Sequence, residues 1–207
     1  KSYKGAFRML NLIRLAMGTE SHKDTFEAIV EIDETYVGGK PRRENTHKGK
    51  ATQKSKRGRG TSKTPVVGVL ERNSGRIHAV IAMPNKEGKK LSGKQLLSIL
   101  DEVCKKNMTV MTDQLASYGI LDGKTEKKYV HVKVDHSMTY SLGDGKHTNG
   151  IESCWAILKR GIYGIYHHVS VKHLQEYVDE FCFRLNHRNI ESAWVYLLGL
   201  GIKWVSA

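Results

Sequence analysis

Three acidic residues stand where the sequence predicts ordered structure rather than a loop. Asp33 lies inside VEIDETY, whose alternating apolar residues predict a strand. Asp113 ends a second short apolar strand, VMTD, and Glu152 lies in HTNGIESCWAILKR, where apolar residues recur at helical spacing. An aspartate between apolar neighbours in a strand is disfavoured and costly to bury unpaired. These positions therefore predict that another part of the molecule compensates the acids.

Carboxylates on two neighbouring strands and on a covering helix suit a site for divalent cations. Mg²⁺ prefers hard carboxylate oxygens and keeps several of its waters, so three carboxylates can hold two ions. Two such ions, about 4 Å apart, activate the attacking oxygen and stabilise the leaving oxygen in phosphoryl transfer. The residues alone thus lead to the hypothesis of phosphodiester chemistry that depends on Mg²⁺, or on Mn²⁺ as its substitute.

Each residue also has a simpler interpretation. Asp33 could be a hydrogen-bonded structural aspartate, and Asp113 could cap a helix that begins at Gln114. Glu152 could be a solvated glutamate that the helix dipole favours. Lys159, two turns after Glu152 on the same side of the helix, could be a surface lysine rather than a phosphate ligand. The combination of residues, rather than any one of them, favours a site.

The charge of the chain indicates a polyanionic partner. The 207 residues carry 34 Lys or Arg against 21 Asp or Glu, a formal net charge of +13, which favours nucleic acid. Residues 40–64 hold ten of these cations and one glutamate, which predicts a flexible basic loop or, alternatively, a merely solubilising one. The cations expected to contact DNA are Arg42, Arg43, Lys56, Arg57, Arg59, Lys159 and Arg160.

Several other classes of protein are disfavoured. No apolar run approaches the roughly 20 residues that span a bilayer, so no membrane partner is expected. The sequence has no P-loop, no G-x-S-x-G motif and no H-E-x-x-H zinc motif. Three widely spaced cysteines, Cys104, Cys154 and Cys182, predict buried thiols in a reducing compartment rather than disulfides.

The elements that must position the acids are predicted in the order strand, hairpin, helix, strand, helix, strand and helices. The predicted strands are 26–37, 65–71, 76–83, 108–112 and 129–134, and the predicted helices are 3–17, 92–103, 114–121, 149–162, 170–185 and 191–198. Three antiparallel strands followed by helix-linked strands predict an α/β fold, a mixed sheet with helices on both faces. RNase H-like nucleases have the same order.

Two of the helices carry more detailed predictions. In the first, Leu10 and Ile13 are expected on the apolar side, with Arg14 on the polar side. In the helix that carries Glu152, either Asn149 or Ser153 is expected at the N-terminus.

Long segments resemble the DDE transposases of bacterial insertion sequences, in the subgroup related to the eukaryotic Merlin elements. The segments are VEIDETYVGGK, TPVVGVLER, VMTDQLASY, HTNGIESCWAILKRGIYGIYHHVS and EYVDEFCFRLNHR, which follow in this order over residues 25–190. The resemblance implies an RNase H-like catalytic domain that cleaves DNA at transposon ends and transfers the strand to target DNA. It also implies a bacterial cytoplasmic protein that associates with the nucleoid when bound to DNA.

The resemblance also implies roles for the acids. Asp33, Asp113 and Glu152 match the catalytic, metal-binding D, D and E, which hold two Mg²⁺ ions, and Lys159 matches a basic residue seven positions later. Some members of the family have Asn in the third position, so Asn149 is the alternative third ligand. The alternative functions are a transposase-derived DNA-binding protein without catalysis and an RNase H-like nuclease.

The resemblance finally divides the chain. Residues 1–20 resemble the last helix of an N-terminal helix-turn-helix DNA-binding module, 25–190 form the DDE catalytic domain, and 191–207 add a C-terminal helix. The cysteines of the family's N-terminal zinc ribbon are missing from this sequence, as if a preceding segment were cut off. Because the family pairs two transposon ends, a dimer or larger homo-oligomer is expected in the working complex with DNA.

Overall fold

Five strands form one mixed sheet in a computed structural model that describes residues 2–19, 25–38, 63–83, 91–113, 116–122, 129–134, 147–189 and 193–205. The strands are β1 (Val30–Val37), β2 (Thr64–Glu71), β3 (Ile77–Ile81), β4 (Thr109–Thr112) and β5 (Val130–Lys133). Their order across the sheet is β3-β2-β1-β4-β5. β1, β2 and β3 pair antiparallel, whereas β4 and β5 add in parallel beside β1. The predicted RNase H-like mixed sheet is therefore confirmed.

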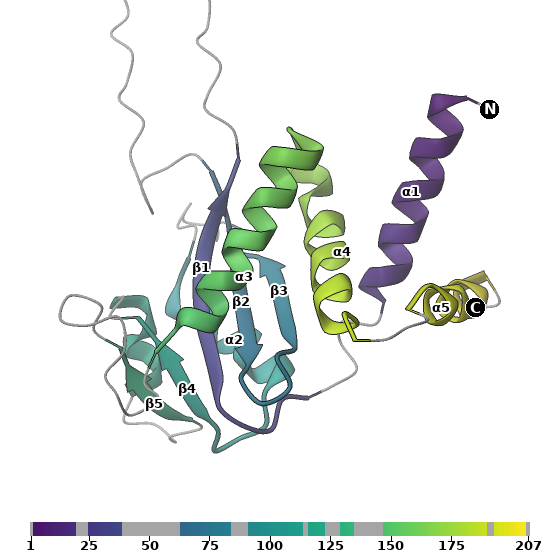
Figure 1. Ribbon diagram of the computed structural model, residues 1–207. Coiled ribbons are helices and arrows are strands. Elements are labelled where there is room, and N and C mark those ends of the chain that lie inside the picture. The colour runs from purple at the N-terminus through teal and green to yellow at the C-terminus, as the bar shows by residue number, and fades with distance from the viewer. Residues whose placement is uncertain are drawn as a thin grey trace, which may run out of the picture.

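Helices cover both faces of this sheet (Figure 1). α2 (Gly93–Val103) lies on one face, and α3 (Asn149–Arg160) and α4 (Leu174–Asn186) lie on the other. Because side chains alternate along a strand, β1 contributes to both faces. Val30 and Ile32 join the core under α2, whereas Val37 joins the core under α3.

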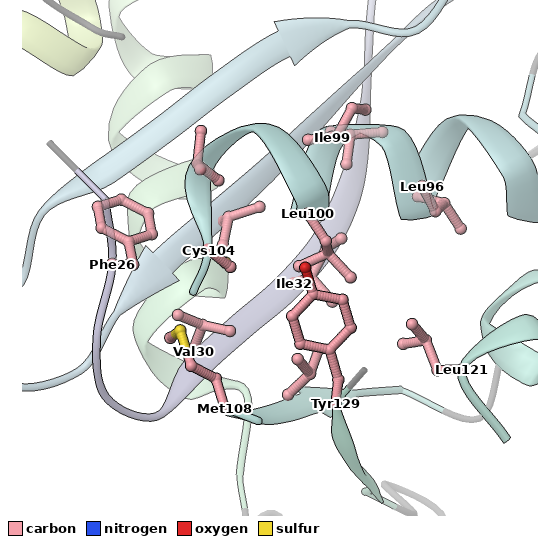
Figure 2. Packing of buried hydrophobic residues seen from close by; sticks show 14 of the residues in the cluster. Phe26, Val30, Ile32, Leu96, Ile99, Leu100, Cys104, Met108, Leu121 and Tyr129 are labelled. Atoms are coloured by element: carbon pink, nitrogen blue, oxygen red, sulfur yellow. The ribbon is translucent and has the colours of Figure 1, made fainter. Parts of the chain in front are cut away.

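The core under α2 combines the strands with one amphipathic helix (Figure 2). Leu96 and Leu100 of α2 are fully buried against Val30 and Ile32 of β1. The helix begins at a capping box, because the Ser92 side chain accepts from the Gln95 backbone N–H while Gln95 reaches back to the backbone N–H of Ser92. This face of the sheet is closed by apolar packing.

α3 crosses the other face beside β1 and β2 (Figure 1). Its predicted apolar stripe is buried, with Ile151, Trp155 and Leu158 all below a tenth exposed. The helix begins at Asn149, one of the two predicted starting residues, and Thr148 occupies the N-cap without a side-chain capping bond. The last turn continues into a π-helix, η3 (Gly161–Tyr166), followed by the 3-10 turn η4 (Val171–His173), while the 3-10 turn η2 (Ala116–Asp122) follows β4.

The outer helices depart most from the predictions. α1 (Tyr3–Gly18) packs against α4, and α5 (Ala193–Val205) packs against α1 (Figure 1). Arg14, predicted on the polar side of α1, is 2% exposed, whereas Leu10 and Ile13 are 40% and 37% exposed. The reason is an ion pair at 2.7 Å between Arg14 Nε and Glu180 Oε2 of α4, which hydrophobic periodicity does not register. The division of the chain into a helix-turn-helix remnant and a catalytic domain stays a prediction.

Candidate metal and DNA site

Asp33 lies in the middle of β1 on the face that α3 covers. Its register partner on β2 is Gly68, a position where a side chain would collide with α3. A Cβ built on Gly68 would lie 2.5 Å from Cη2 of Trp155. The missing side chain lets the indole reach the sheet, where Trp155 Nε1 donates to Asp33 Oδ2 at 3.1 Å. Gly68 and Trp155 thus hold the carboxylate of Asp33 beneath α3.

Asp113 and Glu152 act electrostatically on Asp33. Asp113 follows directly after β4, the strand beside β1, and Glu152 lies in the first turn of α3. The pKa of Asp33 is raised to about 6, mainly by burial and further by the negative charges of Asp113 and Glu152. Hydrogen bonds from the Glu34 backbone and from Trp155 oppose that rise. Asp113 and Glu152 therefore both contribute negative charge at the Asp33 carboxylate.

Asp33, Asp113 and Glu152 are residue types that suit a divalent cation. Their carboxylates offer hard oxygen ligands, and a nearby cation would offset both the burial and the negative charges that raise the Asp33 pKa. Within the part of the chain that the structure describes, no three or more Asp, Glu, His or Cys side chains form a group that could hold a metal ion. Glu152 Oε1 accepts from Thr148 Oγ1 at 3.1 Å.

Asn149, the alternative third ligand, lies on the surface at the first position of α3. Its backbone carbonyl accepts from Ser153 Oγ at 2.8 Å. The charge from α3 that acts on Asp33 belongs to Glu152. This arrangement favours Glu152, although the choice between the two residues stays a prediction.

Two of the predicted DNA-contacting residues lie at the end of α3. Lys159 and Arg160 occupy its last turn, and both are exposed. Lys159 follows Glu152 by seven residues, so both project from the same side of the helix. The other five predicted contacts fall in the basic loop outside the described residues: Arg42, Arg43, Lys56, Arg57 and Arg59.

A second acid of β1 was not predicted to matter. Glu31 is 1% exposed, and its carboxylate accepts from Arg72 Nε at 2.7 Å and from the Ile151 backbone N–H at 2.9 Å. The sequence does carry a signal for it, since Glu31 and Asp33 are two positions apart and share a face of the strand. A glycine inside a strand likewise signals close approach by another element, which would have drawn attention to Gly68.

The three predicted cysteine thiols play no part in this site. Cys104, Cys154 and Cys182 are buried and unpaired, as the sequence predicted. Burial is the main cause that raises the thiol pKa of Cys154 to about 11 and that of Cys104 to about 12. Such thiols remain protonated and unreactive near neutral pH.

The described residues also include no helix with the length and hydropathy to cross a membrane.

Comparison with solved structures finds retroviral integrases at low sequence identity. A chain in the simian T-cell lymphotropic virus intasome in complex with PP2A regulatory subunit B56 gamma matches at 14% identity and a TM-score of 0.48. The match covers 83% of this chain and 52% of that one, so this protein spans about half the integrase length.

Two integrase catalytic cores match over most of their own lengths. The HTLV-2 integrase catalytic core domain in complex with magnesium, in dimeric form, matches at 13% identity and a TM-score of 0.42, covering 82% of this chain and 92% of that one. The BIV integrase catalytic core domain matches at 11% identity and a TM-score of 0.41, covering 85% and 97%. These matches concern the fold alone. The sheet is defined by its own strand order, β3-β2-β1-β4-β5.

Comparison with protein families gives a direct assignment. No curated protein matches the chain. Residues 25–186, well over half of the sequence, match the model of the ISXO2-like transposase domain. That span includes β1 to β5, α3 and α4, and therefore every acid of the site. The chain belongs to the ISXO2-like transposase domain family.

Proposed function

We propose that the chain is the catalytic domain of an insertion-sequence transposase that cleaves DNA at transposon ends and joins the freed 3′ end to target DNA. The observation that carries the proposal is the electrostatic group around Asp33, in which Asp113 and Glu152 contribute charge from a neighbouring strand and from α3. Membership of the transposase family supplies the reaction class. Both lines of support concern the same stretch of the chain.

In the proposed mechanism, Asp33 and Asp113 would hold both divalent ions and Glu152 would hold one of them. Mg²⁺ or Mn²⁺ would supply activation of the attacking oxygen and stabilisation of the leaving oxygen. Trp155 keeps the Asp33 carboxylate oriented through its indole N–H. Lys159 and Arg160 hold the DNA backbone beside the scissile phosphate, since lysine and arginine neutralise phosphates. In the cleavage step, water attacks the scissile phosphate and the P–O3′ bond breaks, which leaves a 3′-hydroxyl on the transposon end and a 5′-phosphate on the flanking DNA. In the transfer step, that 3′-hydroxyl attacks a phosphate of the target DNA, and the P–O3′ bond of the target strand breaks to release a target 3′-hydroxyl.

Partners and location follow from the same proposal. The two transposon ends and the target DNA are the substrates, and a dimer or larger homo-oligomer holds two ends together. The protein would act in the bacterial cytoplasm, on the nucleoid when bound to DNA. Light scattering of the protein with an end-containing duplex tests the assembly: two or more chains per complex are expected, and one chain would contradict it.

The experiment that tests the chemistry uses Asp113→Asn. Cleavage of a duplex that carries the transposon end, with Mn²⁺ present, should fall at least about a thousandfold, because a cation ligand supplies several kcal/mol of transition-state stabilisation. Glu102→Gln, an exposed acid of α2, is the control and should cleave normally. Undiminished cleavage by Asp113→Asn would overturn the assignment.

A DNA-binding protein without catalysis is the second candidate function. It is favoured by one observation, that the described residues contain no ligand group already closed around an ion position. Calorimetric titration with Mn²⁺ separates the two candidates, because the transposase should bind Mn²⁺ in a manner that Asp33→Asn and Asp113→Asn abolish. A nuclease of the RNase H type would cleave yet fail to join a 3′-hydroxyl end to a second DNA.

A further inference from the structure

Glu31 uses both of its carboxylate oxygens to hold α3. Oε1 accepts from Arg72 Nε at 2.7 Å, and Oε2 accepts from the backbone N–H of Ile151 at 2.9 Å. The first backbone N–H groups of a helix have no partner inside the helix, and the dipole there favours a negative charge. Glu31 therefore satisfies a free donor at the start of α3 from a neighbouring strand.

The contact lies directly beside a proposed metal ligand. The N–H that Glu31 accepts belongs to the Gly150–Ile151 peptide, and Glu152 is the next residue along α3. An added Cβ at Gly150 would lie 2.7 Å from Leu70 Cδ2 and 3.0 Å from Glu31 Oε2. The glycine thus allows the first turn of α3 to rest on the sheet at this point.

Arg72 fixes the same turn from a second direction. Arg72 lies just beyond β2. Its guanidinium donates both to the Glu31 carboxylate and to the carbonyl oxygen of His147, shortly before α3 begins. Its side chain is 17% exposed and that of Glu31 is 1% exposed, so the pair is largely shielded from water. Breaking either contact leaves a buried charge or donor without its partner, which is costly.

We propose that Glu31 and Arg72 are positioning residues that set the first turn of α3, and thereby Glu152, relative to Asp33 and Asp113. The inference rests on the proposed function, in which Glu152 binds metal. Glu31 shares a strand face with Asp33 but does not join the ligands, because both of its oxygens are already engaged. Groups that orient metal ligands in this way alter metal affinity about 10-fold to 100-fold when removed.

The first experiment measures the position of α3 without metal or activity. Glutamine keeps the shape of Glu31 but presents an amide in place of one oxygen, so one of its two donors loses its acceptor. Glu31→Gln should speed hydrogen exchange at Ile151 and its neighbours in residues 147–153, while leaving α4 unchanged. Unaltered exchange in 147–153 would overturn the positioning role while leaving the proposed function intact.

The second experiment measures whether Glu31 acts through Glu152. Calorimetric Mn²⁺ titration should show about a tenfold weaker affinity for Glu31→Gln. In a Glu152→Gln background the same change should have no further effect, since the ligand that it positions is gone. Arg72→Lys is a milder change. It should weaken the Mn²⁺ affinity less than Glu31→Gln does, and it should have no further effect in the Glu152→Gln background. An equal loss in both backgrounds would overturn the inference.

A matched control separates positioning from general loss of stability. Glu180 is also buried and paired with an arginine, Arg14, but lies on α4. Glu180→Gln should destabilise the fold while leaving Mn²⁺ affinity unchanged, and a similar loss of affinity in this variant would overturn the inference. If Glu152→Gln itself left the Mn²⁺ affinity unchanged, both the proposed function and the action of Glu31 through Glu152 would be overturned. Hydrogen exchange would still show whether Glu31 positions α3.

Discussion

Two acids on the same face of β1 lie in opposite electrostatic environments. Glu31 accepts from Arg72 and from the N-terminus of α3, so its charge is matched by a cation and a helix dipole. Asp33, two residues later, accepts from Trp155, but burial and, to a smaller degree, the negative charges of Asp113 and Glu152 raise its pKa. The Glu31 carboxylate is thus paired with a cation, whereas the charged form of the Asp33 carboxylate is disfavoured.

The contrast between Glu31 and Asp33 separates an acid that holds elements together from an acid that contributes to a candidate site. A buried charge with a buried counter-charge holds elements together, and its loss destabilises the protein. A partly buried charge among like charges costs stability and persists where function needs it. Glu31 therefore belongs to the support of α3, and Asp33 belongs to the site that α3 covers.

The largest expected effect comes from removing the compensated acid. Glu31→Ala should lower the free energy of unfolding by about 3–5 kcal/mol, because Arg72 would keep a buried charge without its partner. Urea unfolding measures it. Glu27→Ala is the control, since Glu27 and its partner Lys105 are both exposed, and it should cost less than about 1 kcal/mol. Equal losses of unfolding free energy in Glu31→Ala and Glu27→Ala would contradict the structural role of Glu31.

Removing the other acid should have the opposite sign. The pKa of Asp33 is about 6 in the folded chain against 3.8 ordinarily, so without metal the free energy of unfolding falls as pH rises from about 4 to 6. Above pH 6 the Asp33 carboxylate is charged in both states and the penalty is complete. Asp33→Asn should then be more stable than wild type by up to about 3 kcal/mol.

Below pH 4 the advantage of Asp33→Asn should vanish, because Asp33 is then protonated in both states. Urea unfolding in EDTA at pH 4 and pH 7 measures the change. Added Mn²⁺ should reverse the order of the two proteins at pH 7, since a ligand that binds only the folded state stabilises it. A variant less stable than wild type at pH 7 without metal would contradict the strained environment of Asp33.

A smaller effect is expected from filling the space opposite Asp33. Gly68→Ala would bring a Cβ to 2.5 Å from Trp155, so the indole must shift away from Asp33. Overpacking of this kind costs about 1–3 kcal/mol. Gly119→Ala is the control, because its Cβ would meet nothing within 4 Å. Thermal unfolding of the two variants measures the difference, and equal melting temperatures would show that α3 does not rest closely on Gly68.

The smallest effect concerns the exposed end of α3. Lys159→Ala should weaken DNA binding only a few-fold and reduce the slope of log affinity against log salt by about 0.9, the share of one phosphate contact. Fluorescence anisotropy between low and moderate salt measures the slope. Lys106→Ala, an exposed lysine near β4, should leave it unchanged. If Lys159→Ala left the slope of log affinity against log salt unchanged, Lys159 would not contact a DNA phosphate.

Much of the fold was predictable because its signals are local. The hairpin of β2 and β3, the stripe of α3 and the capping box of α2 each form within one continuous segment of the chain. Arg14 was assigned to the wrong side of α1 because its partner Glu180 is 166 residues away. Periodicity counts apolar residues and cannot weigh an ion pair formed between helices.

The strands and the helix that carry Asp33, Asp113 and Glu152, the excess of positive charge and the transposase family all follow from the amino-acid sequence. The sequence does not indicate which acid of β1 is paired with a cation, and the three-dimensional arrangement does. Arg72 is 41 residues from Glu31 and Ile151 is 120 residues from it, so their meeting depends on strand register and on the docking of α3. The physical reason is that the energy of a buried charge depends on its neighbours in space.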